Sequence, residues 1–215
     1  MATPAATDEI HEANVRYHDL AAENYDAKWG IDYGERGRSQ VVGKLRKALG
    51  SREEEPFRRG LEIGAGTGYF GLNLLRGGVI EEYTASDVSQ GMLDVLAGSA
   101  DRLELPARIA RCGATRLPFP DSSFDLVFGH AVLHHLPDLD GSFSEFMRVL
   151  APGGAIAFCG EPSHHGDRIA EVPKRVAHVL APAWRALVGA SAAARNGHHH
   201  DPEEGPLEAL VDVHA

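Results

Sequence analysis

An acidic residue followed by a run of glycines is the segment of this chain that most clearly predicts a ligand. Residues 61–70 read Leu-Glu-Ile-Gly-Ala-Gly-Thr-Gly-Tyr-Phe, so Glu62 stands just before the first glycine, Gly64. Glycines allow a tight turn and let a ligand approach the backbone closely, and a helix that begins after them presents free N–H groups. The segment therefore predicts a loop that binds a polar or anionic ligand.

Two kinds of ligand fit this loop. The stretch from Gly66 to Gly71 matches GxGxxG, the dinucleotide fingerprint. A dinucleotide site has an apolar strand before its first glycine, whereas here Glu62 is acidic, which would repel a pyrophosphate but suits an ammonium group. Asp87, at the end of the next expected strand, can accept hydrogen bonds from both hydroxyls of a ribose, and this fits either ligand.

Strands alternate with helices in the segments that must position these residues. Strands are expected at 59–63, 82–86, 107–112, 124–128 and 155–159, and helices at 10–29, 39–49, 69–76, 89–100 and 140–150, with a short helix after the fourth strand. This order predicts an α/β fold, a Rossmann-like, doubly wound and mainly parallel sheet. The strand ends then share one edge, where ligands bind near the switch in strand order.

Three further segments carry recognisable motifs. Residues 117–127 read LPFPDSSFDLV, residues 132–137 read VLHHLP, and residues 145–154 read EFMRVLAPGG. Together with the acid-x-Gly-x-Gly-x-Gly loop, they resemble class I S-adenosylmethionine-dependent methyltransferases of the small-molecule type, the group of the ubiquinone and menaquinone methyltransferases. The resemblance covers about residues 17–161.

The resemblance implies S-adenosylmethionine as cofactor and methyl transfer to an O, N or C atom of a small molecule. The implied cofactor contacts are Glu62, Gly64, Ala65, Gly66 and Gly68 at the methionine portion, Asp87 at the ribose, Val88, Met92, Gly113, Ala114 and Thr115 at the adenine, and Gly129 and His130 at the sulfonium. Many relatives carry an aspartate in place of Gly113, which accepts a hydrogen bond from the adenine amino group. We therefore expect weaker adenine selectivity here.

Histidines after the fourth strand are candidates for proton transfer. Methyl transfer depends mostly on positioning, and a base is needed only where the acceptor atom carries a proton. His135 is the candidate we prefer over His130 and His134, because on a helix His134 should point elsewhere. A packing role for this pair is the alternative, and His164 and His165 are further candidates.

The chain divides into three expected parts, a helical lid (1–50), a methyltransferase core (51–161) and a helical or irregular tail (162–215). Aromatic residues of the lid either cover the cofactor and acceptor or form the apolar face of a helix; they are Tyr17, His18, Tyr25 and Trp29. Residues 198–200 are histidines that read as an exposed loop, so no metal is expected. Since relatives end with two more strands of a seven-stranded sheet, we expect a truncated fragment that lacks them.

The composition limits the partners. The 215 residues are 43% hydrophobic and 24% charged, which is typical of a globular domain. A net charge of −10 disfavours nucleic acid or an anionic membrane as partner. Two isolated cysteines, the absence of a long apolar run and a polar start of the chain predict a cytoplasmic protein. The expected partner is a small methyl acceptor, the oligomeric state stays open, and a protein that binds cofactor or a partner without turnover is the alternative.

Overall fold

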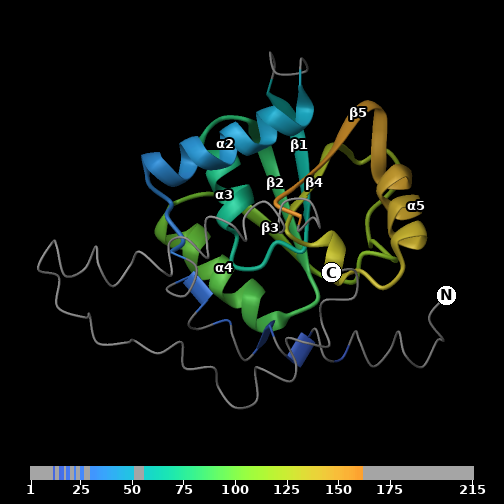
Figure 1. Cartoon of the computed structure of the whole chain (residues 1–215), viewed down its shortest axis with the longest axis horizontal. Coiled ribbons are helices and arrows are strands. Elements are labelled where there is room, and N and C mark those ends of the chain that lie inside the picture. Colours follow the sequence, from blue (N-terminus) through green and yellow to red (C-terminus); the bar gives the residue numbers. More distant parts are fainter. Residues whose placement is uncertain are drawn as a thin grey trace, which may run out of the picture.

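A parallel sheet is the frame of the described part of the chain. The computed structural model describes residues 12, 15, 16, 18, 19, 22, 25, 26, 30–50 and 56–161. Five strands follow the order β3-β2-β1-β4-β5, and every neighbouring pair is parallel (Figure 1). The strands are β1 (Phe57–Ile63), β2 (Ile80–Asp87), β3 (Ala107–Arg111), β4 (Phe124–His130) and β5 (Leu150–Cys159). The helices are α2 (Glu35–Leu49), α3 (Tyr69–Arg76), α4 (Gln90–Arg102) and α5 (Leu139–Val149), with the 3-10 turn η1 (Leu133–His135). The expected Rossmann-like α/β fold is confirmed.

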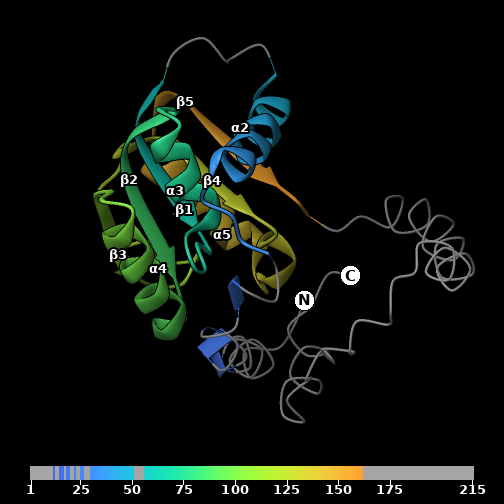
Figure 2. The same cartoon turned by 90° about the vertical axis from the view of Figure 1, so that its left-hand side faces the viewer.

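Helices cover both faces of the sheet (Figure 2). On one face lie α2, α3 and α4, where Val41, Leu45 and Leu96 pack with buried side chains of β2 and β4. On the other face lies α5, where Phe146 and Val149 pack against β1 and β4. Because all strands run in the same direction, the loops that follow them meet at one edge of the sheet, as expected.

The start of α5 differs from the expected one. α5 begins at Leu139 rather than Asp140, because the side chain of Asp138 accepts the backbone N–H of Gly141 at 2.9 Å. An aspartate that caps a helix in this way precedes the first helical residue. The expected start at residue 140 was therefore one residue late.

The start of β5 also differs. We expected Pro152 and the two glycines after it to separate the helix from a strand at 155–159, whereas β5 already begins at Leu150. Leu150 pairs with Phe124, the pairing then shifts register, and Ala155 pairs with Leu126. A bulge thus accommodates the Pro-Gly-Gly segment inside the strand, which is one of the places where a sheet tolerates proline.

Several expectations fall outside the described residues. These are the tail 162–215 with any further strands, His164, His165 and residues 198–200, and the aromatic residues Tyr17 and Trp29. The described residues between 12 and 26 are helical, as expected. Within the described ranges, no helix has the length and apolar character that crossing a bilayer requires.

A buried carboxyl group joins β1, β2 and α3. Glu62 is 1% exposed, and its Oε2 accepts the Tyr83 hydroxyl at 2.5 Å and the backbone N–H of Gly71 at 3.1 Å. A methyl group built on Gly71 would overlap both the Tyr83 ring and the Glu62 carboxyl. Gly71 is the last glycine of the GxGxxG match, and its role here is close packing of a helix on a strand.

Aspartate 125, in the FD motif, joins β4 to the start of β1. Its Oδ2 accepts the backbone N–H of Arg58 at 3.0 Å, and its Oδ1 accepts that of Arg59 at 2.8 Å. Both N–H groups belong to the first residues of β1, the strand that the chain enters after α2. The motif that suggested a family resemblance is therefore structural at this position.

The overlap at Gly71 predicts opposite effects of two glycine-to-alanine changes. Gly71→Ala should lower the free energy of unfolding by about 1–3 kcal/mol, because the added methyl overpacks a buried cluster. Gly98→Ala is the matched control, since Gly98 lies in α4 with no atom within 4 Å of the added methyl. That change should raise stability by up to about 1 kcal/mol through helix propensity. Urea unfolding measures both, and a Gly71→Ala protein as stable as Gly98→Ala would contradict the packing role.

Candidate functional site

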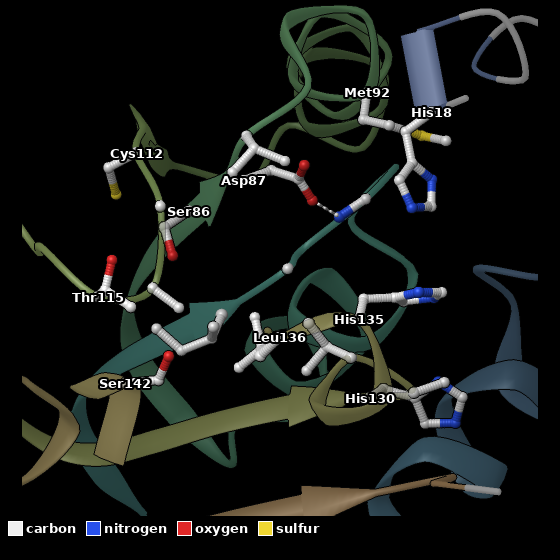
Figure 3. A pocket seen from close by; sticks show the side chains of 18 of the residues that line it. His18, Ser86, Asp87, Met92, Cys112, Thr115, His130, His135, Leu136 and Ser142 are labelled. Atoms are coloured by element: carbon white, nitrogen blue, oxygen red, sulfur yellow. Dashed lines mark hydrogen bonds between the residues drawn. The ribbon is translucent and has the colours of Figure 1, made fainter. Parts of the chain in front are cut away.

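Two adjoining cavities lie at the carboxyl edge of the sheet. The first has a volume of about 340 Å³ and is bounded by β2, α4 and the segment after β3 (Figure 3). The second has a volume of about 560 Å³ and reaches α2. Both cavities share the walls formed by His18, Tyr25, Gly64, Gly66, His130, Ala131 and His135. The glycine loop therefore borders both spaces, which adjoin along it.

The carboxylate at the end of β2 faces the first cavity. Asp87 Oδ2 accepts the backbone N–H of Gly66 at 2.8 Å (Figure 3). Its Oδ1 accepts the backbone N–H of Ser89 at 2.9 Å. Burial raises the pKa of Asp87, while these backbone hydrogen bonds oppose the shift. A carboxylate offers about four acceptor positions, so Asp87 can accept further donors from a ligand.

Side chains around Asp87 give the cavity an apolar wall and a cover. Val88 and Met92 line it, and Ser89 caps α4 by accepting the Met92 N–H. From the N-terminal helix, Asp19 Oδ1 accepts the Ser89 hydroxyl at 2.5 Å and the Gly91 N–H at 3.0 Å. This contact fastens the helix that carries His18 to the rim of the cavity.

The segment after β3 forms the far wall of the first cavity. Gly113, Ala114 and Thr115, for which the family resemblance implied contacts with adenine, line it, and a methyl group built on Gly113 meets no atom within 4 Å. Sequence reasoning missed the opposite wall, where Leu136, Pro137, Asp138 and Ser142 lie. Their position directly after the VLHH motif was the signal that could have found them.

Arg148 of α5 holds the segment after β3 in place. Its Nη1 donates to the Phe119 carbonyl at 2.8 Å, and its Nη2 donates to the Leu117 carbonyl at 3.0 Å. Glu145 accepts the Leu117 N–H at 2.9 Å and pairs with Arg148. The LPF motif (residues 117–119) and the EFMR motif (residues 145–148) thus contact each other, and this contact supports a wall of the first cavity.

The predicted site residues of the glycine loop do not all line a cavity. Glu62, Gly64, Ala65 and Gly66 line the second cavity, and burial raises the pKa of Glu62 to about 8 against the opposing hydrogen bonds from Tyr83 and Gly71. Two of the predicted glycines, Gly68 and Gly129, line neither cavity. A side chain on Gly68 would overlap Leu96 and Leu72, and one on Gly129 would overlap Phe158 and Val132. Packing behind the cavity walls is what the structure shows for these two glycines.

His130, at the end of β4, is the first of three histidines beside the cavities. Its ring stacks on Phe70 with centroids 5.0 Å apart, and its Nε2 lies 2.8 Å from Lys44 Nζ. Burial, with the charge of Lys44, lowers the pKa of His130 to about 4. Burial likewise lowers the pKa of His18 to about 4. Both rings are therefore neutral near pH 7.

His134 does not point away from His135, so that expectation was wrong. The two ring centroids are 3.9 Å apart, and both side chains line the second cavity. The reason is Glu161, which binds His134 Nδ1 at 2.9 Å and accepts the N–H groups of Val132 and Leu133. The expected short helix is the 3-10 turn η1, and the contact with Glu161 fixes the His134 ring beside that of His135. In the part of the chain that the structure describes, no three side chains gather as a metal site would require.

Known proteins resemble this chain in sequence. Residues 61–158 match the family described as methyltransferase domain. The malonyl-[acyl-carrier protein] O-methyltransferase of Halorhodospira halophila is 32% identical over 194 residues, which cover 90% of this chain and 59% of that protein. The demethylmenaquinone methyltransferase of Deinococcus radiodurans is 31% identical over 137 residues, which cover 64% of this chain and 57% of that protein. The chain thus spans less than two thirds of these relatives.

A solved structure shares the fold. It is phosphoethanolamine N-methyltransferase 2 of Haemonchus contortus, in complex with phosphomonomethylethanolamine and S-adenosylhomocysteine. The TM-score is 0.58 at 24% identity, over 75% of this chain and 38% of that one. Residues 61–158 thus form a methyltransferase domain, and the fold around them is that of an S-adenosylmethionine-dependent methyltransferase.

Proposed function

We propose that this chain transfers a methyl group from S-adenosylmethionine to a small-molecule acceptor by in-line displacement. The observation that carries the proposal is the pair of cavities joined at the glycine loop, one against Asp87 and the other against Glu62 and α2. A ligand with a nucleoside at one end and an amino acid at the other fits such an arrangement. S-adenosylmethionine, rather than a dinucleotide, is therefore the cofactor we propose.

The residues of the first cavity fit the nucleoside end of that cofactor. Asp87 has acceptor capacity for ribose hydroxyls, and Val88 and Met92 offer an apolar surface to a base. Gly113, Ala114 and Thr115 would follow the adenine edge, and the loop glycines Gly64 and Gly66 would allow the backbone to approach the ligand closely. Gly68 and Gly129 would act only indirectly, by letting the loop and β4 pack.

Proton removal would depend on His135. When bound, the cofactor supplies an electrophilic methyl group, so the chain's own task is to position the acceptor and, where needed, to take its proton. His135 lines both cavities, and its ring contacts that of His18 with centroids 5.6 Å apart. With their pKa values near 4, His18 and His130 are weak bases, and we keep His135 as the candidate base because it lines both cavities.

The acceptor we propose is small and is not a nucleic acid. The net charge of −10 gives no general attraction for a phosphate backbone. A cytoplasmic location stays a prediction from the two cysteines, Cys112 and Cys159, which are both unpaired. The oligomeric state is left open.

Asp87 gives the first test of cofactor binding. Asp87→Asn should weaken the affinity for S-adenosylhomocysteine at least tenfold, because hydrogen bonds to a charged acceptor contribute about 1.5–3 kcal/mol each. Asp94→Asn is the matched control, since Asp94 is an exposed residue of α4 that lines neither cavity. Calorimetric titration measures both, with thermal unfolding to check that the variants fold. Equal affinities of Asp87→Asn and wild type would contradict the proposal that Asp87 binds the ribose.

Gly113 gives a test in the opposite direction. Gly113→Asp should strengthen cofactor binding by about tenfold, since the added carboxylate has open space and can accept the adenine amino group. Gly113→Ala controls for the loss of backbone freedom. If Gly113→Ala strengthens cofactor binding as much as Gly113→Asp does, adenine does not pass this position. The same conclusion holds if Gly113→Asp does not strengthen binding.

The proposed base is tested by pH. For an acceptor whose O or N atom carries a proton, His135→Gln should lower kcat/KM by about 10²–10⁴-fold and remove the acid limb of its pH profile. His134→Gln should keep that limb, because His134 is engaged with Glu161. An unchanged profile in His135→Gln would assign the histidine pair to packing.

A further inference from the structure

One carboxylate joins the end of β5 to the turn after β4. Glu161 Oε1 accepts the backbone N–H groups of Val132 at 2.9 Å and of Leu133 at 3.1 Å. Its Oε2 lies 2.9 Å from Nδ1 of the His134 ring. A single side chain after β5 thus binds both the backbone of the turn and one of its two histidines.

The chain brings Glu161 to this position through Gly160. Just before it, the Ala131 N–H donates to the Cys159 carbonyl at 2.8 Å, so the two segments are already side by side. Gly160 has a positive φ of 76°, and a methyl group built on it would lie 2.6 Å from His130 Nε2. Glycine therefore lets the chain pass close to the His130 ring, and the next residue reaches the turn.

Glu161 is an anion, and this decides where His134 carries its hydrogen. Burial favours a raised pKa for Glu161, but the hydrogen bonds from His134, Val132 and Leu133 outweigh burial and lower the pKa below its ordinary value. A carboxylate accepts hydrogen bonds and donates none, so the hydrogen between the two groups belongs to His134 Nδ1. The side chains of His134 and Glu161 are 15% and 24% exposed, so water screens their contact only in part.

The His134 ring passes this constraint to His135. The centroids of these two rings are 3.9 Å apart, and His135 also contacts the ring of His18 at 5.6 Å (Figure 3). His135 is thus held between two rings, one of which is fixed by Glu161. The other histidines and charged side chains that line the two cavities or adjoin His18 are Asp19, Lys44, Glu62, Asp87, His130 and Asp138.

We propose that Glu161 is a positioning residue for His135, acting through the ring of His134 and the backbone of η1. The inference rests on the proposed function, in which His135 takes a proton from the methyl acceptor. A base must hold its ring at one place relative to the acceptor, and a nearby anion stabilises the imidazolium that forms when the proton arrives. Glu161 lines neither cavity, so it acts on the acceptor only through His135.

Two substitutions separate the charge of Glu161 from its support of the turn. Glu161→Gln keeps an oxygen for the N–H groups of Val132 and Leu133 but removes the charge, and Glu161→Ala removes both. Nitrogen NMR of the histidine rings in the full chain is the readout, with His134→Gln and His135→Gln identifying the two signals. Wild type should keep the hydrogen on His134 Nδ1. Glu161→Gln should lower the pH midpoint of His135 protonation by about 0.5–1 unit, because loss of an anion disfavours the imidazolium.

The matched control is Asp140→Asn, which removes the same charge from an exposed residue of α5 that lines neither cavity. It should leave the midpoint of His135 unchanged. An equal fall in Asp140→Asn would refute the inference, because the effect would then be one of net charge. If Glu161→Gln keeps the wild-type midpoint while Glu161→Ala loses stability, Glu161 only supports the turn, and the inference is likewise refuted.

An activity arm uses the acceptor chosen for the test of His135. Glu161→Gln should lower kcat about tenfold and move the acid limb of the pH profile to lower pH, with the affinity for S-adenosylhomocysteine unchanged. If His135→Gln slows methyl transfer but Glu161→Gln does not, the inference alone fails. If His135→Gln leaves methyl transfer unchanged, or wild type does not bind S-adenosylhomocysteine, the proposed function fails at that point, and the inference with it.

Discussion

A carboxyl group buried in the core needs hydrogen-bond donors, and this need fixes the geometry around β1. Glu62 finds its donors in Tyr83 and Gly71 because α3 approaches the strand closely enough for its backbone to reach the carboxyl. The approach is possible only where the helix has no side chain. Once α3 is fixed in this way, the loop between it and β1 has one path. The wall that the two cavities share is a consequence of that path.

The order of elements could be predicted from the sequence because it depends on local periodicity. Each expected strand and helix of the core exists, and α3 has the expected bounds. The bounds differ at the starts of several elements. α2 begins at Glu35 rather than at residue 39, α5 is capped by Asp138, and before β5 a Pro-Gly-Gly segment that reads as a turn became a bulge. The bulge is decided by pairing with β4, which is not encoded within a few residues.

Where motif and strand end coincide, as for Asp87 and the segment after β3, the residues singled out from the sequence line the first cavity. Contacts whose partner comes from a distant part of the chain were not predicted. Lys44 meets His130, Asp19 meets Ser89, and Glu161 meets His134 only because the parallel sheet gathers their elements at one edge. Nothing in the spacing of these residues indicates such contacts. The orientation of His134 was wrong for this reason, since the local turn gave no sign of Glu161.

The contact of Asp19 with the start of α4 has a consequence for the carboxylate at the end of β2. Asp19 follows His18, which lines both cavities. Asp19 accepts hydrogen bonds from Ser89 and Gly91, and Ser89 in turn donates its N–H to Asp87. One serine therefore contacts both the Asp87 carboxylate and the N-terminal residue next to His18, so the positions of the two depend on each other.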